Sequence, residues 1–129
     1  MPWENSKKIE WVLRVAVAGE FFGHAMFALG GKADWIKWTS MLTGASFETA
    51  ASLITLVGIL DVFVAVVVLV RPVRAILLWA AFWGFWTALV RPLVGLPVWD
   101  FIERFANWGA PLALLLMLGW PKSIKDWLK

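Results

Sequence analysis

Residues 47–70 read FETAASLITLVGILDVFVAVVVLV, a run in which only Glu48 and Asp61 carry a charge. A helix needs about 20 apolar residues to cross the hydrocarbon core of a bilayer, and this run is long enough. Three further apolar stretches occupy residues 9–29, 73–90 and 99–118, separated by glycine, proline and basic residues typical of helix ends. The sequence therefore predicts an all-α fold in a single domain, an integral membrane four-helix bundle.

The composition of the whole chain agrees with this prediction. The 129 residues are 61% hydrophobic and 16% charged, whereas soluble domains are about 45–50% apolar and about 25% charged. These values exclude a disordered, collagen-like or coiled-coil protein and argue against a soluble enzyme. The absence of cysteine excludes thiolate metal sites, iron–sulfur clusters and disulfide exchange. A net charge of +3 with scattered basic residues gives no indication of nucleic-acid binding.

The connection between the first two spans carries tryptophans beside charged residues. Trp35 and Trp38 lie next to Lys32, Asp34 and Lys37, so residues 33–41 are expected to form a short helix at the membrane interface. An Ala-Val-Ala sequence at 16–18 resembles a signal-peptide cleavage site, but Glu10 and Arg14 interrupt the apolar core that such a peptide needs.

Basic residues set the expected orientation. With four spans, the two termini and the loop after the second span share one side of the membrane, and that side holds Lys7, Lys8, Arg71, Arg74, Lys122, Lys125 and Lys129. The opposite side holds only Lys32, Lys37 and Arg91. The positive-inside rule therefore predicts a multi-pass protein of the inner (plasma) membrane with both termini in the cytoplasm.

The fourth span carries the clearest polar pattern. Asp100, Glu103, Arg104 and Asn107 follow the i, i+3, i+4, i+7 spacing that places side chains on one face of a helix. Pro111 continues this face and removes the hydrogen bond that the carbonyl of Asn107 would otherwise accept. Charged groups inside a bilayer are expensive, so this face is expected to turn toward the interior of the bundle.

The first three spans also contain ionisable residues. Glu20 and His24 lie one turn apart, and Gly19 and Gly23 beside them favour close approach of another helix. Counting about 1.5 Å per residue, Arg14 and Asp61 come within one or two turns of each other in the inner half, which predicts a structural ion pair.

The remaining polar groups are expected to converge on a pocket in the outer half of the bundle. They are Glu20, His24, Glu48, Arg91, Asp100, Glu103, Arg104 and Asn107. Four carboxylates then face two arginines and one histidine, so at least one carboxylate is left over. Either a carboxyl is protonated, or a cation binds, or water enters. Alternatively, the carboxylates at helix starts serve only as capping or interfacial groups.

Tryptophans dominate the third span. Trp79, Trp83 and Trp86 lie on one face, whereas Ala80, Gly84 and Ala88 form a small-residue seam on another. The tryptophan stripe either packs in the bundle or lines a site for a flat apolar ligand such as a quinone, sterol or prenyl lipid.

Metal and haem chemistry receive little support. Glu20, His24, Asp100 and Glu103 are potential ligands, but the chain has no Glu-x-x-His pair, and one histidine cannot form a bis-histidine haem site. No metal is therefore expected. Transport would require a homodimer, because one short chain offers no internal repeat and little room for a path.

Several short motifs are similar to those of a known family. They are Arg14, Gly23-His24, Gly30-Gly31-Lys32, then Asp61 followed by Arg71 or Arg74 with Ala75, and finally Gly119. Together they resemble the DoxX-like family of small four-helix membrane proteins over about residues 14–119. The resemblance implies a link to membrane redox systems, since some relatives are the small subunit of a thiosulfate:quinone oxidoreductase. A more distant similarity is to four-helix sterol-isomerase-like proteins.

These observations lead to one main hypothesis about function. The protein is expected to be an accessory or quinone-interacting subunit of a membrane redox system, in which Glu20 and His24 exchange protons. Arg91 and Arg104 would hold an anionic group or tune the carboxylates, beside Asp100, Glu103, Asn107, Trp83 and Trp86. The rival is a non-catalytic structural or partner-binding subunit. A third interpretation is a lipid-isomerase-like enzyme, and the sequence leaves open whether there is turnover.

Overall fold

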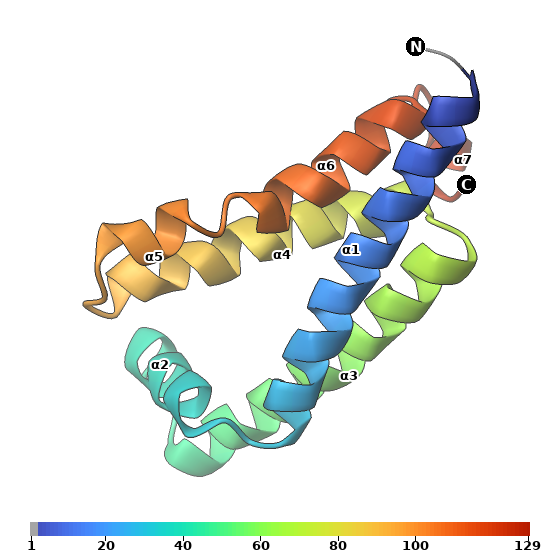
Figure 1. The fold of residues 1–129 in the computed structure, drawn as a ribbon. Helices are drawn as coiled ribbons and strands as arrows, with labels where there is room; N and C mark the ends of the chain where they lie inside the picture. The colour runs from blue at the N-terminus through green and yellow to red at the C-terminus, as the bar shows by residue number, and fades with distance from the viewer. Residues whose placement is uncertain (1–2) are drawn as a thin grey trace.

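The computed structural model describes residues 3–129, and every regular element in that range is a helix (Figure 1). The helices are α1 (Trp3–Leu29), α2 (Ala33–Thr43), α3 (Phe47–Val70), α4 (Arg74–Leu93), α5 (Val98–Ile102), α6 (Ala106–Leu118) and α7 (Ile124–Trp127). Four segments are long and apolar enough to cross a membrane: Glu4–Leu29, Phe47–Val70, Arg74–Leu93 and Val98–Leu118. The predicted all-α membrane bundle is confirmed, and the chain is a multi-pass membrane protein.

The long helices form two pairs that lean against each other at one end. Helix α1 packs along α3, and α4 packs along α6. The pairs converge where both termini lie, with α1 also touching α6, and they diverge toward α2 and α5 (Figure 1). Helices α3 and α4 follow each other in sequence but have few contacts, so a space opens between them on the side of α2.

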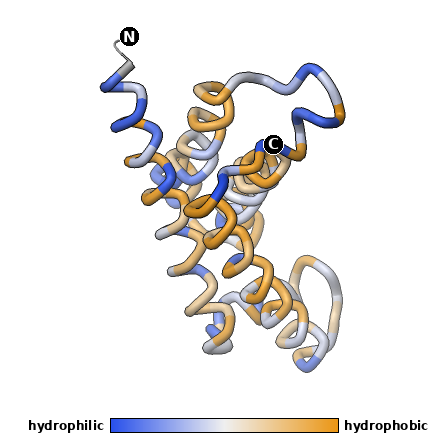
Figure 2. Tube along the Cα trace, turned by 90° about the vertical axis from the view of Figure 1, so that its right-hand side faces the viewer, coloured by the Kyte–Doolittle hydropathy of each residue, from blue (hydrophilic) through white to orange (hydrophobic). Residues whose placement is uncertain are grey.

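The buried core lies in the convergent half of the bundle. Its largest fully buried members are Val17, Phe21, Val64, Val68, Leu77, Leu114 and Leu115. A second, smaller cluster of Ala28, Ile36, Ala50 and Ile54 fixes α2 against the far ends of α1 and α3. Most of the outer surface of the helices is also hydrophobic, and hydrophilic residues gather at the helix ends and loops (Figure 2). This distribution matches a bundle surrounded by lipid.

The start of α2 and its end both depend on glycine. Gly31 turns the chain from α1 into α2 with a φ of 71°, and Gly44 ends α2 with a φ of 72°, a region that favours glycine. The Ser46 hydroxyl then accepts the Thr49 N–H at 3.2 Å and begins α3. The short helix predicted between the first two spans is thus present, and it extends two residues further than expected, to Thr43.

The sequence predicts the fourth span as one continuous helix, and the structure differs from this prediction. It is broken at residues 103–105, between α5 and α6. The N–H of Arg104 bonds to the carbonyl of Phe101 rather than that of Asp100, and the Arg104 Nη1 instead donates to the Asp100 carbonyl at 2.7 Å. Because the backbone leaves the regular α-helical hydrogen-bond pattern there, the stripe of Asp100, Glu103, Arg104 and Asn107 does not lie on one regular helix.

The two predicted small-residue contacts have different outcomes. Gly84 lies so close to α6 that an added Cβ would be 2.7 Å from the carbonyl carbon of Asn107, and Ala80 and Ala88 are fully buried beside it. The seam on α4 is therefore confirmed. Gly19 and Gly23 have open space around the position of a Cβ, so they make no close helix contact among the described residues.

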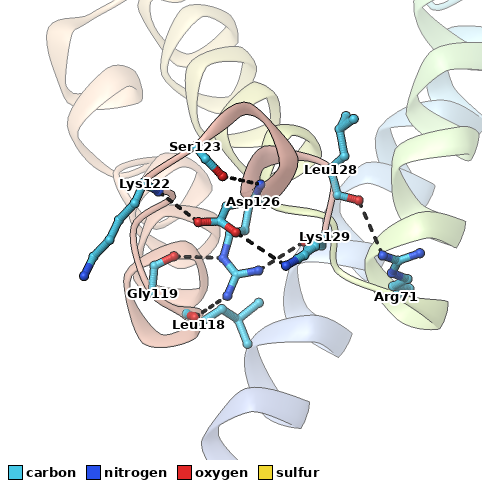
Figure 3. Close-up of polar contacts among 9 residues, drawn as sticks. Arg71, Leu118, Gly119, Lys122, Ser123, Asp126, Leu128 and Lys129 are labelled. Atoms are coloured by element: carbon cyan, nitrogen blue, oxygen red, sulfur yellow. Dashed lines mark hydrogen bonds and ion pairs between the residues drawn. The ribbon is translucent and has the colours of Figure 1, made fainter.

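A polar cluster holds the terminal end of the molecule together (Figure 3). Arg74, at the start of α4, donates from Nε to the Gly119 carbonyl at 2.8 Å, from Nη2 to the Leu118 carbonyl and from Nη1 to the Lys129 carbonyl at 3.3 Å. It thereby binds carbonyls that the end of α6 leaves without helical partners. The Lys122 N–H donates to Asp126 at 3.1 Å and holds the pKa of that carboxyl below its usual range.

Candidate functional site

A cavity of about 440 Å³ lies between α2, α3 and α4, in the half of the bundle away from the termini. Helix α1 contributes His24, and the other three helices supply the remaining walls. We call this space the tryptophan pocket, because it is lined by Trp35 and Trp38 of α2 and by Trp79, Trp83 and Trp86 of α4. It exists because the two helix pairs diverge there and α2 folds back over the gap.

The walls of the tryptophan pocket are apolar and partly flat. The Trp79 and Trp83 rings stack with 5.4 Å between centroids and 16° between planes. They are one turn apart on α4, so the helix itself fixes the spacing that lets them stack. Helix α3 supplies aliphatic side chains on the other wall: Leu53, Ile54, Leu56, Val57 and Leu60. Such walls suit a molecule with a planar or elongated apolar body.

Six polar side chains interrupt these walls. Thr39 and Thr43 come from α2, Thr87 and Arg91 from α4, His24 from α1 and Asp61 from α3. The imidazole of His24 packs edge-on against Trp35, with 5.5 Å between ring centroids. Asp61 is 1% exposed, and its Oδ1 has no hydrogen-bond partner among the described residues. The indole N–H groups of Trp35 and Trp79 also have no acceptor within that part of the chain.

Arg91 is the one buried cation of the tryptophan pocket. The residue is only 8% exposed. Its guanidinium lies over the Trp38 ring, 5.3 Å from the ring centroid, and donates from Nη1 to the Thr87 carbonyl at 2.6 Å. No Asp or Glu within residues 3–129 forms an ion pair with it. Asp100 of α5 and Glu103, which follows α5, act on it only from a distance, against the repulsion of Arg104.

The predicted ion pair between Arg14 and Asp61 is not formed. Arg14 pairs with Glu10 at 3.1 Å, and it donates to the carbonyls of Val68, at 3.1 Å, and Leu69. Those carbonyls belong to the last turn of α3, which lacks helical donors and carries the negative end of the helix dipole. They lie about 10 Å along α3 from Asp61 at ~1.5 Å per residue, so Arg14 is held too far away.

The predicted convergence of polar residues is only partly found. His24, Arg91, Trp83 and Trp86 do line the tryptophan pocket. The other predicted members do not: Glu20, Glu48, Asp100, Glu103, Arg104 and Asn107. The break in the fourth span explains most of this, because Arg104 pairs with the exposed Glu103 at 2.7 Å and Asn107 turns its backbone toward Gly84. Glu48 is exposed at the start of α3, as the capping alternative expects.

Glu20 remains inside the bundle but outside the pocket lining. It is half-buried on α1, one turn from His24, and its carboxyl interacts electrostatically with that of Asp61. The pocket thus has an acidic side at Asp61, backed by Glu20, and a basic side at Arg91.

Sequence reasoning missed Asp61 as a pocket residue and the contribution of α2. The available signal was that Asp61 is the only charge in the middle of an otherwise apolar span, with no partner fixed by local spacing. The role of α2 depends on tertiary folding, which helix periodicity does not reveal. Among residues 3–129, no three His, Asp or Glu side chains gather closely enough to hold a metal ion.

Comparisons with protein-family models, curated proteins and solved structures find no match. The resemblance to the DoxX-like family therefore stays an expectation from short sequence motifs, and the function must be argued from the tryptophan pocket itself.

Proposed function

We propose that this protein binds a lipid-soluble, largely apolar molecule in the tryptophan pocket, as an accessory subunit of a membrane redox system. The observation that carries the proposal is the pocket itself, a cavity of about 440 Å³ with a stacked tryptophan wall inside a membrane bundle. Small-molecule sites typically enclose about 300–1,000 Å³, are mostly apolar and have a few polar groups that orient the ligand.

A quinone is the first ligand class to test. Its flat ring matches the stacked faces of Trp79 and Trp83, and its carbonyl oxygens match the unused N–H groups of Trp79 and Arg91. An isoprenoid tail finds apolar contact between α3 and α4, where Leu56 is lipid-exposed. In the proposed orientation, the protein lies in the inner membrane with both termini in the cytoplasm. The tryptophan pocket then lies in the outer half of that membrane.

Native mass spectrometry of the protein extracted gently from its own membrane tests this proposal, with the organic extract analysed in parallel. We expect one lipid-soluble molecule per chain, and a quinone or other prenyl lipid is the first class to look for in the extract. Trp83→Ala should remove the ligand, whereas Trp120→Ala, which changes an exposed tryptophan near α7, should retain it. A bare chain, or equal retention by both variants, contradicts the proposal.

A structural subunit is the second candidate, and specific contacts favour it. Arg14 and Arg74 both bind backbone carbonyls at helix ends, and Arg104 binds the carbonyl freed at the α5–α6 break. These arginines stabilise the bundle and are unavailable for ligands. His24→Ala separates the two functions: a structural histidine lowers the melting temperature without affecting ligand retention, whereas a pocket histidine changes ligand retention in a folded protein.

A further inference from the structure

We infer that the ligand of the tryptophan pocket is an amphiphile with a negatively charged head, a carboxylate or a phosphate, which Arg91 neutralises. The inference rests on the proposed function, because it names the chemistry of the molecule that occupies the same pocket. It narrows that molecule from any lipid-soluble compound to an anionic one.

The first step is the unbalanced charge of Arg91. The residue is 8% exposed, and the one hydrogen bond that its guanidinium makes within residues 3–129 goes to the Thr87 carbonyl. A guanidinium has five N–H donors and keeps its charge in proteins. A buried charge without a partner is strongly destabilising. An anion in the pocket would supply both the missing charge and the missing acceptors.

The second step is the charge around Arg91. Arg104 and Lys32 act electrostatically on His24 together with Arg91, although only Arg91 lines the pocket. Arg104 is balanced by its ion pair with Glu103. Asp100 is the other carboxylate that acts on Arg91, and it remains outside the pocket lining. The local balance is therefore positive by about one charge, and a single anionic head would neutralise it.

The third step is the orientation of the ligand. Asp61 lines the pocket from α3, interacts with Glu20 rather than forming an ion pair with Arg91, and would repel an anion when ionised. The head is consequently directed to Arg91, and the apolar chain follows Trp83 and Trp79. The gap between α3 and α4 leads from there to lipid, because Leu56 of the pocket wall is 61% exposed.

A cationic ligand at Asp61 is the reverse arrangement, and the chemistry favours it less. A carboxyl becomes neutral by taking up a proton, whereas the guanidinium of Arg91 has no such route. A neutral ligand, including a quinone, satisfies hydrogen bonds of Arg91 but leaves its charge without a counter-ion.

The test uses the full chain in phosphatidylcholine nanodiscs and cis-parinaric acid as a fluorescent probe, excited by energy transfer from the tryptophans of the chain, five of which line the pocket. Bound probe is displaced with tetradecanoate, tetradecyl phosphate or the neutral tetradecanol. The three compounds share one chain length and differ only in their head group. We expect at least one of the anions to displace the probe about tenfold more effectively than the alcohol, as for a charge-assisted hydrogen bond. A carboxylate preference indicates a fatty-acid type of ligand, and a phosphate preference indicates a lipid phosphate.

Variants assign the preference to one residue. Arg91→Gln should remove the advantage of the anions, Arg91→Lys should retain part of it, and Lys37→Gln, an exposed charge on α2, should behave like the unchanged protein. Equal displacement by the alcohol and both anions in the unchanged protein overturns the inference but leaves the proposed function standing. Failure of all three to displace the probe, or failure of the probe to bind, overturns the inference, while the proposed function is decided separately by the native mass spectrometry of the extracted protein. The comparison of the two anions with the alcohol in the unchanged protein decides the inference, even when Arg91→Gln fails to fold.

Discussion

Arg14 illustrates how single residues hold this bundle together. Its guanidinium bonds to two carbonyls at the end of α3 and to Glu10, while its face covers the Trp11 ring at 3.8 Å. Arg14 therefore links α1 to the C-terminal end of α3, at the end of the bundle where both termini lie. Asp61 contributes nothing to this link, although both residues are buried charges in neighbouring helices.

A double-mutant cycle distinguishes the partners of Arg14. We expect Arg14→Gln and Glu10→Gln to show a coupling energy of about 1 kcal/mol, because the two side chains form a half-buried ion pair. Arg14→Gln and Asp61→Asn should be additive within about 0.5 kcal/mol. The measurement is thermal unfolding in detergent. Coupling to Asp61 that exceeds coupling to Glu10 would contradict the observed contacts.

Gly84 is the residue at which a single methyl group matters most. A Cβ there would meet the backbone of Asn107, with the carbonyl carbon at 2.7 Å, and a backbone cannot rotate away as a side chain can. We expect Gly84→Ala to destabilise the protein by about 1–3 kcal/mol, as overpacking does. Unfolding monitored by circular dichroism provides the measurement.

Gly109→Ala is the matched control for this substitution. Gly109 also lies inside a helix, α6, but nothing lies within 4 Å of its added Cβ. Alanine is the better helix former by about 1 kcal/mol, so this variant should be neutral or slightly more stable. Equal destabilisation by both substitutions would show that the close approach of α4 and α6 is not the cause.

At the scale of helices, the sequence predicts where the chain is helical but not every interruption. The helix at 47–70 agrees with prediction, and α1 ends at Leu29 as predicted but begins six residues earlier than expected, at Trp3. The break at residues 103–105 is different, because no glycine or proline marks it. It is stabilised locally by Arg104 on the Asp100 carbonyl and by the approach to Gly84, and the second contact depends on how α4 and α6 pack.

Helix α7 is held by groups that respond to pH. The Lys122 N–H, Ser123 and Lys129 all contact Asp126, and the hydrogen bond from Lys122 lowers the pKa of its carboxyl below the ordinary value of 3.8. Because the folded carboxyl is the stronger acid, its ionised form stabilises the docked segment above that ordinary value. This contribution is lost as the pH falls through the lower value of the folded state.

We therefore expect hydrogen exchange in residues 120–129 to increase as the pH is lowered below about 4, relative to the intrinsic rate at each pH. Asp126→Asn should remove this pH dependence, and Arg74→Gln should raise exchange at all pH values by releasing α6 and Lys129. A pH dependence that persists in Asp126→Asn would assign the effect to another group.

At the scale of the whole molecule, the sequence reveals the chemistry of the candidate site better than its geometry. His24, Arg91, Trp83 and Trp86 stand out as polar or aromatic residues within spans, and all four line the tryptophan pocket. The pocket itself follows from the divergence of two helix pairs and from α2 folding over the gap, which are tertiary features. Helical periodicity places a side chain on a face but does not say how far the next helix stands from that face.

The topology of the whole chain gives the last prediction, and the absence of cysteine makes it direct to test. Four spans place both termini on one side, and both lie at the same end of the bundle (Figure 1). Asn5→Cys and Ile124→Cys change exposed residues at that end, and Ala33→Cys changes one at the start of α2, without removing a basic residue. A membrane-impermeant maleimide should label Ala33→Cys in intact cells and label the other two only after lysis, because the terminal side carries more lysine and arginine. Labelling of Asn5→Cys and Ile124→Cys on opposite sides would contradict four spans, and labelling of both in intact cells would invert the orientation while leaving the bundle unchanged.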